Sequence, residues 1–346
     1  MRAEQDFYVG KVRAIKNGII TLASKGASKK RIPFSAERPV SIENGDIVLL
    51  TEIDDVHVLW RSHSKDNVII ITNACNQMCR YCPQPRTADT FSNVAINRAL
   101  LSNLEKKDIS FVTITGGEPT LMHSALIDLL KQLLKKNPLA SIALLTNGME
   151  FDDMSFAYEI VKAGKSQTRI CVSLHSDSPF IHDSITGVPG SFERTALGLL
   201  NLHRTGADIE LRVVLNRLNF ERLPDIAFSI GMNFPFVSHV AFMGLELHAT
   251  AAYNAKEVWV DPPAYMNQLK RAIYQLQCRK IPSSIYNLPY CLVSKSLWAY
   301  MRDSISGWKK TFLPLCDFCL MKPTCPGLFM TSIFQSPSIR PIKTIL

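Results

Sequence analysis

The chain lacks any apolar run close to the about 20 residues that a helix needs to cross a bilayer. No positively charged stretch followed by an apolar one marks a signal peptide at its start. A disulfide framework is not expected, because 346 residues can bury an ample core and nine cysteines are an odd number. Reduced cysteines in a chain without these signals predict a cytoplasmic protein with no membrane partner.

Negative charge is also scarce, since 30 acidic residues face 39 lysines and arginines, for a net charge of +9. The positive residues are scattered, apart from the short runs 29–31 and 309–310. No stacking-aromatic motif accompanies them, so nucleic acid is not expected as a partner. An acidic leader peptide or partner protein would explain the charge equally well, and the charge also needs no explanation.

Three cysteines form the most informative motif, a C-x3-C-x2-C run at Cys75, Cys79 and Cys82. The β-branched run 67–71 precedes them and predicts a buried parallel strand. Iron–sulfur clusters are held by thiolates on closely spaced cysteines, and three ligands on a four-iron cluster leave one iron open. Such spacings also occur in structural zinc sites, which need four ligands, and in thioredoxin-like redox pairs. Spacing alone favours iron–sulfur.

Helices and strands alternate after this motif. Further strands are predicted at 111–115, 142–145, 170–174, 209–214 and 239–244, and helices at 96–104, 123–136, 154–163, 192–203 and 223–230. Six βα units in a row predict a parallel sheet covered by helices, whose ligands sit at the carboxyl ends of the strands. Polar or glycine-rich motifs stand at these ends, at 116–120, 146–148 and 175–176.

The cysteine motif, with Tyr81 before its third cysteine and Gly-Gly-Glu-Pro one βα unit later, resembles the radical S-adenosylmethionine (radical SAM) superfamily. The resemblance covers about residues 67–245 and implies an α/β fold, a partial (β/α)6 TIM-like barrel. It implies that Cys75, Cys79 and Cys82 hold a [4Fe–4S] cluster whose open iron chelates SAM. Such enzymes take an electron from a flavodoxin- or ferredoxin-type donor and cleave SAM to a 5′-deoxyadenosyl radical, which abstracts hydrogen from the substrate.

The same resemblance implies where SAM is contacted. The strand-end glycines would let the backbone approach its amino group, because they carry no Cβ. The implied contacts are Gly116, Gly117, Glu118 and Pro119 for the amino group, Ser173 and His175 for ribose and carboxylate, and Asn216 with 243–244 for ribose and adenine; Tyr81 stands beside the cluster. Three of these have plainer readings: Asn216 as a turn residue, Met243 as core and His175 as a structural histidine.

A second cysteine group, Cys316, Cys319 and Cys325, resembles a shortened SPASM or twitch extension, which binds auxiliary iron–sulfur clusters in peptide-modifying radical SAM enzymes. Cys291 is the best fourth ligand, so a second [4Fe–4S] cluster that relays an electron is predicted. Zinc is the alternative, because four cysteines with a C-x2-C pair satisfy a tetrahedral site. The two remaining cysteines, at 171 in an apolar strand and 278 in a predicted helix, are expected to be small buried hydrophobes.

A finer resemblance, to the radical SAM maturases of His-Xaa-Ser repeat systems, rests on segments 72–75, 174–176, 286–291 and 308–329. It implies a precursor peptide with His-Xaa-Ser repeats as substrate and a second radical SAM maturase as partner. The sequence departs from that pattern at Cys325-Pro326-Gly327, where a double glycine is expected, and this puts the local turn in question.

Three other functions are alternatives. The molybdopterin-pathway cyclase needs a terminal Gly-Gly arm and wider cysteine spacing, whereas this sequence ends at 343–346 in Lys-Thr-Ile-Leu. An RNA- or small-molecule-modifying radical SAM enzyme is the second. A zinc-stabilised, non-catalytic peptide-binding scaffold is the third, and it would not need the intact cysteine motif.

The expected organisation has three parts: a small β-rich domain at 1–65, the barrel at 66–250, and C-terminal helices with the auxiliary cysteines at 251–346. Short strands between turn signals, at 7–9, 18–22, 47–50 and 57–60, predict the first part. The leading hypothesis is a radical SAM peptide maturase.

Overall fold

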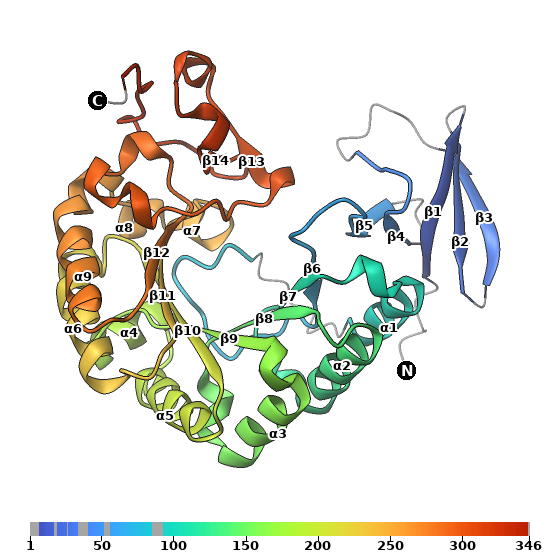
Figure 1. Cartoon of the computed structure of the whole chain (residues 1–346), viewed down its shortest axis with the longest axis horizontal. Helices are drawn as coiled ribbons and strands as arrows, with labels where there is room; N and C mark the ends of the chain where they lie inside the picture. Colours follow the sequence, from blue (N-terminus) through green and yellow to red (C-terminus); the bar gives the residue numbers. More distant parts are fainter. Residues whose placement is uncertain are drawn as a thin grey trace. The chain divides into compact units, whose positions relative to one another are not determined.

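The computed structural model describes residues 7–16, 19–25, 27–33, 41–51, 56–84 and 93–344 (Figure 1). The chain divides into two compact units, which are described separately. The first comprises Met1–Ala74, Asp89–Leu144 and Lys162–Thr168, and the second Cys75–Ala88, Leu145–Val161 and Arg169–Leu346. Among the described helices, none has the length and apolar character needed to span a bilayer.

The N-terminal part is an antiparallel sheet in the order β3-β2-β1-β4-β5. Its strands are β1 (Tyr8–Lys16), β2 (Ile19–Ser24), β3 (Ala27–Pro33), β4 (Ile47–Leu50) and β5 (Val56–Trp60). The buried side chains of Val12, Ile20, Leu22 and Val48 form its core. The four predicted strands are present, although residue 18 of one lies outside the described residues. Strand β3 was not predicted, because its centre is the basic run 29–31.

The rest of the first unit begins the parallel sheet. It contains β6 (Val68–Ile70), α1 (Val94–Asn103), β7 (Phe111–Thr115), α2 (His123–Lys136) and most of β8 (Ser141–Thr146). Helix α2 forms because leucines recur at helical spacing on one side, and five of them are buried. Strand β7 and helix α2 have the bounds that the sequence predicts.

The second unit continues the βα pattern. Its elements are most of α3 (Met154–Gly164) and of β9 (Thr168–Ser173), and all of α4 (Pro179–Thr186), α5 (Ser191–Arg204), β10 (Asp208–Leu215), α6 (Leu223–Asn233), β11 (His239–Gly244), α7 (Thr250–Tyr253), α8 (Ala255–Val258), α9 (Met266–Cys278), β12 (Ser283–Tyr286), β13 (Lys310–Thr311) and β14 (Leu328–Phe329). Helices α5, α6 and α9 lie along one side of β10–β12 (Figure 1).

The strands form one sheet in the order β12-β11-β10-β9-β8-β7-β6, with parallel pairing. A parallel sheet with helices packed on it confirms the predicted α/β class and TIM-like partial barrel. The predicted number of six strands is wrong, because a seventh, β12, pairs with β11. Its sequence Ser-Ser-Ile-Tyr is too short and polar to signal a strand, and only pairing with β11 makes it one.

Candidate functional site

The Cys75–Cys82 loop, which carries the first cysteine motif, is held by the end of α4. The backbone N–H of Met78 donates to Thr186 O at 2.8 Å, and that of Arg80 donates to Ile185 O at 3.0 Å. The last carbonyls of a helix have no partner within the helix, so the loop satisfies both. Gly187 ends α4 at φ +71°, and a Cβ there would lie 3.2 Å from Met78 O.

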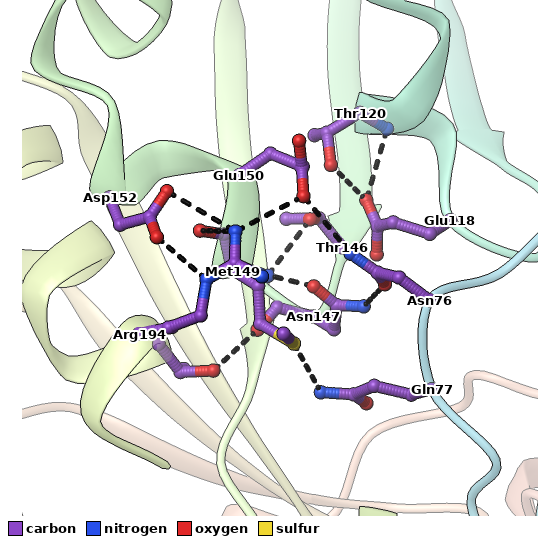
Figure 2. Close-up of polar contacts among 12 residues, drawn as sticks. Asn76, Gln77, Glu118, Thr120, Thr146, Asn147, Met149, Glu150, Asp152 and Arg194 are labelled. Carbon is purple, nitrogen blue, oxygen red and sulfur yellow. Dashed lines mark hydrogen bonds and ion pairs between the residues drawn. The ribbon is translucent and has the colours of Figure 1, made fainter. Parts of the chain in front are cut away.

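Asn76, inside the loop, is held by side chains that follow β8 (Figure 2). Its amide nitrogen donates to Glu150 Oε1 at 3.1 Å, and its amide oxygen accepts from Asn147 Nδ2 at 2.7 Å. Arg194 on α5 pairs with Glu150 at 3.3 Å and with Asp152 at 2.6 Å. The Thr-Asn-Gly motif at the end of β8 therefore contacts the Cys75–Cys82 loop. Glu150 and Asp152, which follow the motif, connect it to α5 through their ion pairs with Arg194.

The cysteines of the loop differ in exposure: Cys75 is exposed, and Cys79 and Cys82 are half-buried. Tyr81 between them is buried, and its hydroxyl bonds His175 Nδ1. Burial, followed by the nearby thiols of Cys79 and Cys82, raises the pKa of Tyr81 well above its usual value. Three cysteines on one short loop, one of them an exposed residue, suit an iron–sulfur cluster that must admit a further ligand.

A buried histidine pair backs this tyrosine. The rings of His175 and His182 lie 5.0 Å apart, and the His175 backbone N–H donates to His182 Nδ1 at 3.3 Å. Burial lowers the pKa of His182 to about 4, and burial followed by His182 lowers the pKa of His175 well below its usual value. Both rings are therefore neutral at pH 7, and His175 fits its structural reading.

The Gly-Gly-Glu motif follows β7 in the first unit. A Cβ on Gly116 would lie 2.4 Å from Thr72 O, and one on Gly117 would lie 2.2 Å from Ala74 O. The backbone N–H of Gly117 donates to Thr72 O at 2.8 Å. The glycines therefore have a structural reason that sequence reasoning missed: they let this strand end pack against the segment that leads into Cys75.

Glu118 is 1 % exposed and its carboxylate caps the turn that follows. Its Oε1 accepts from the Thr120 backbone N–H at 3.0 Å and from Thr120 Oγ1 at 2.6 Å, and Pro119 opens this turn (Figure 2). The proposed contacts of residues 116–119 with SAM stay a prediction.

The remaining predicted SAM contacts lie at other strand ends. Ser173 is the last residue of β9 and is half-buried, as is Met243 near the end of β11. Asn216 follows β10 and is fully buried; its amide donates to Val214 O at 2.8 Å and accepts from the Leu218 N–H at 2.9 Å. These bonds hold the turn after β10, and the contact of Asn216 with SAM stays a prediction.

The C-terminal cysteines Cys291, Cys316, Cys319 and Cys325 line one pocket. Backbone N–H groups donate to three of these sulfurs. The Ile342 N–H donates to Cys319 Sγ at 3.3 Å, and the Arg340 N–H donates to Cys291 Sγ. The N–H groups of Gly327 and Tyr290 donate to Cys325 Sγ. Burial nevertheless raises the pKa of Cys291 and of Cys325. Donors aimed at sulfur stabilise thiolates, the form that binds metal.

The turn at Cys325-Pro326-Gly327 forms without a second glycine, because Gly327 alone takes φ +78°.

The prediction for the two remaining cysteines is half right. Cys171 is buried in β9, and burial raises its pKa to about 12. Cys278 is exposed instead, because the last residue of α9 lies outside the apolar stripe of that helix. Across the described part of the chain, no three His, Cys, Asp or Glu side chains are grouped to hold a single metal ion.

Sequence reasoning missed Glu150, Asp152 and Arg194, although the Thr-Asn-Gly motif just before them marked the right strand end. It also missed Asp183 of α4, whose carboxylate accepts from the Gly190 and Phe192 N–H groups at 2.6 and 2.9 Å and so fixes the loop after the helix. Isolated charged residues carry no local signal of this kind.

Comparisons with known proteins find similarity mainly in the part of the chain that forms the parallel sheet and its helices. The Radical SAM superfamily matches residues 69–230. A probable GTP 3′,8-cyclase of Saccharolobus islandicus is 31 % identical over 175 residues, which cover 49 % of this chain and 54 % of the relative. An AdoMet-dependent heme synthase of Oleidesulfovibrio alaskensis is 26 % identical over 161 residues, covering 45 % and 39 %. The chain thus spans only about half the length of these curated relatives.

Among solved structures, Streptococcus suis SuiB bound to S-adenosylmethionine matches with a TM-score of 0.52 and 14 % identity, over 66 % of this chain and 50 % of SuiB. At this identity the likeness concerns the fold. The C-x3-C-x2-C loop and strands β7–β10 lie within the residues that match the family model. Residues 69–230, a little under half of the chain, are thus similar to the Radical SAM superfamily.

Proposed function

We propose that this protein is a radical SAM maturase that modifies a ribosomally made precursor peptide carrying His-Xaa-Ser repeats, together with a second maturase. The observation that carries the proposal is the four-cysteine pocket added to a radical SAM domain. SuiB has been solved bound to the precursor peptide SuiA, and this peptide binding is a property of SuiB. Support for a peptide here comes from the C-terminal cysteines and the segments that resemble the His-Xaa-Ser maturases.

Cys75, Cys79 and Cys82 would hold the first [4Fe–4S] cluster. When bound, the cluster and SAM supply the 5′-deoxyadenosyl radical, after an electron from a flavodoxin- or ferredoxin-type donor. The chain's own contribution is to position and shield. The α4 carbonyls and Asn76 hold the loop, and the buried Tyr81–His175 contact closes one side of it against water.

Cys291, Cys316, Cys319 and Cys325 would hold a second cluster. A tetrahedral zinc site with Zn–S bonds of about 2.3 Å draws its sulfurs to within about 4 Å of one another. The four thiols line one pocket, and the resemblance of the rest of the chain to iron–sulfur enzymes favours a cluster over zinc. A fully ligated cluster there would accept or relay an electron.

The first experiment measures 5′-deoxyadenosine formation after anaerobic reconstitution with iron and sulfide, on addition of SAM and dithionite. The wild type is expected to form it, and the variant with Cys75, Cys79 and Cys82 all changed to alanine is not. The four C-terminal cysteines remain in this variant, so it also serves as a loading control. Absence of deoxyadenosine from a wild type with verified cluster loading would refute the enzyme proposal.

The substrate is tested by co-expression with a His-Xaa-Ser repeat precursor and the second maturase, followed by mass spectrometry of the peptide. A mass change that requires Cys75 is expected. An unchanged peptide, with deoxyadenosine formed, would reject the substrate and keep the radical SAM activity.

A second candidate is a nucleotide-modifying enzyme, which the likeness to GTP 3′,8-cyclases favours. It predicts that GTP is consumed under the same reducing conditions. GTP that survives while deoxyadenosine accumulates would remove this candidate.

A further inference from the structure

Strands β1–β3 of the N-terminal sheet concentrate the positive charge of the chain. Residues 8–33 contain seven lysines and arginines and no aspartate or glutamate, so they account for most of the net charge of +9. Lys11 is buried and pairs with Asp108 at 2.9 Å. The other six are exposed and have no acidic partner among the described residues: Arg13, Lys16, Lys25, Lys29, Lys30 and Arg31.

Three of these cations lie on β3, whose outer edge pairs with no other strand in the described part of the chain. The sheet order places β3 at one end, next to β2 (Figure 1). A strand at the edge of a sheet presents a row of unpaired N–H and C=O groups. Tyr8 on β1 helps to hold β3 in place, because its hydroxyl donates to Ser28 O at 3.1 Å. The edge is therefore a preformed template for one more strand.

The pairing register distributes the cations over both faces of β3. Lys30 pairs with the core residue Leu22 and so lies on the core side of the sheet, where its Nζ is 4.8 Å from the centre of the Tyr8 ring. Lys29 and Arg31 flank Lys30 in the sequence, so they lie on the opposite face. A strand added at this edge has Lys29 and Arg31 beside its own side chains on that face.

Positive charge extends beyond the edge strand. Burial, followed by the charge of Lys25 in the turn before β3, lowers the pKa of Lys136 at the end of α2. Lysines on an edge strand often serve only to keep copies of a chain from pairing, and a few charges on that strand suffice for this. Here the cations spread over two strands and a turn without an acidic side chain between them, which favours an acidic partner.

The edge suits a peptide better than a nucleic acid. Tyr8 is the only aromatic residue of β1–β3 and is 8 % exposed, so these strands offer no surface on which bases could stack. An extended peptide, in contrast, adds to a sheet through the unpaired backbone groups of an edge strand. The side chains along that edge then select the sequence of the peptide.

We propose that the outer edge of β3 binds an extended acidic segment of the precursor peptide as an additional strand of the N-terminal sheet. Lys29 and Arg31 pair with carboxylates two residues apart on that segment, because residues i and i+2 of a strand share a face. The inference rests on the proposed function for the identity of the peptide. It gives the N-terminal sheet the role of holding the substrate.

The test measures binding to the full-length chain by fluorescence anisotropy. The labelled probes are the His-Xaa-Ser repeat precursor and a blocked peptide of four Glu-Val repeats, which is acidic and strand-forming whatever the natural substrate is. K29E/R31E is expected to weaken both about 10-fold, because two attractions become two repulsions. Backbone N–H groups of β3 are expected to exchange hydrogen more slowly when the precursor is bound, since a new strand pairs with them.

The matched control is K270E/R271E, which makes the same change in charge at an exposed lysine and an exposed arginine of α9. It is expected to leave both affinities within about twofold of the wild type. Should K29E/R31E fold poorly, K29Q/R31Q removes the charges without reversing them and is expected to weaken binding about threefold.

Unchanged affinity of both peptides in K29E/R31E, or β3 exchange that the bound precursor does not slow, would overturn the inference. Binding of a single-stranded RNA dodecamer through Lys29 and Arg31, with neither peptide bound, would overturn it in favour of a nucleic-acid site. Binding of the Glu-Val peptide alone would support the acidic-peptide site and reject the His-Xaa-Ser precursor as its occupant. Deoxyadenosine formation without peptide, which K29E/R31E is expected to retain, tests the radical SAM activity separately.

Discussion

Glu150 is the side chain through which α5 supports the cysteine loop. We expect E150A to lower the iron bound by the Cys75 site and to cost about 1–3 kcal/mol of unfolding free energy, because Asn76 and Arg194 both lose a charged partner. Iron assay after chelator challenge and denaturant titration measure the two effects.

The control for E150A is D152N, since Asp152 also binds Arg194 but has no bond to Asn76. It should reduce stability without reducing iron retention. Equal iron loss in both variants would mean that the acidic pair supports α5 and does not position the loop.

His182 makes the stability of the protein depend on pH. Its pKa falls from about 6.5 when unfolded to about 4 when folded, because its ring is buried. The unfolded chain therefore binds a proton between these values that the folded chain does not. The contribution of His182 to the free energy of unfolding should therefore drop by about 3 kcal/mol as the pH falls from 6.5 through 4, and the buried His175 adds to the dependence in the same direction.

Denaturant titrations from pH 4 to 7 measure this dependence. H182N keeps an acceptor for the His175 N–H and should flatten the slope, whereas H203N, at a solvent-exposed histidine of α5, should not. A slope unchanged in H182N would place the titration at another group.

At the scale of elements, the end of β7 fits the segment before Cys75 because Gly117 has no Cβ. G117A would place a Cβ 2.2 Å from Ala74 O, a backbone atom that cannot rotate away. We expect a loss of about 1–3 kcal/mol and reduced iron loading at the Cys75 site, measured by thermal unfolding and iron assay.

G307A is the control, because nothing lies within 4 Å of a Cβ at Gly307. It should leave both quantities unchanged. Full iron loading in G117A would mean that this strand end adapts to the larger residue and does not shape the loop.

The elements that the sequence predicts well are those with their own local signal. Strands β7 and β11 and helix α2 were predicted at their observed bounds, because apolar β-branched runs and leucines at helical spacing are local patterns. Helix α4, strand β3 and strand β12 were missed. They are short or polar, and pairing or packing with the rest of the fold makes them regular.

At the scale of the whole molecule, the number of metal centres depends on whether the C-terminal pocket binds a second cluster. Roughly eight irons per chain are expected in the reconstituted wild type. C291A should lower this to about four, because the pocket loses a ligand, while deoxyadenosine formation with SAM and dithionite persists. Iron and zinc analysis of the wild type and the variant measures this.

C278A is the matched control, since Cys278 is exposed on α9 and does not line the pocket. About four irons in the wild type with one zinc, and zinc lost in C291A, would make the pocket a structural zinc site. The electron-relay role would then be dropped.

The sequence by itself determined the donors and their order along the chain: three thiols on one loop, glycines and polar residues at strand ends, and three more cysteines near residue 320. These features are local or periodic, so they are present in the sequence whether or not the chain is folded. Only the tertiary structure decided which distant side chains meet. Cys291 joins cysteines 25 or more residues away, and Asn76 meets Glu150 and Arg194. Such contacts arise because strand pairing and helix packing bring separate segments together, and no spacing in the sequence encodes that distance.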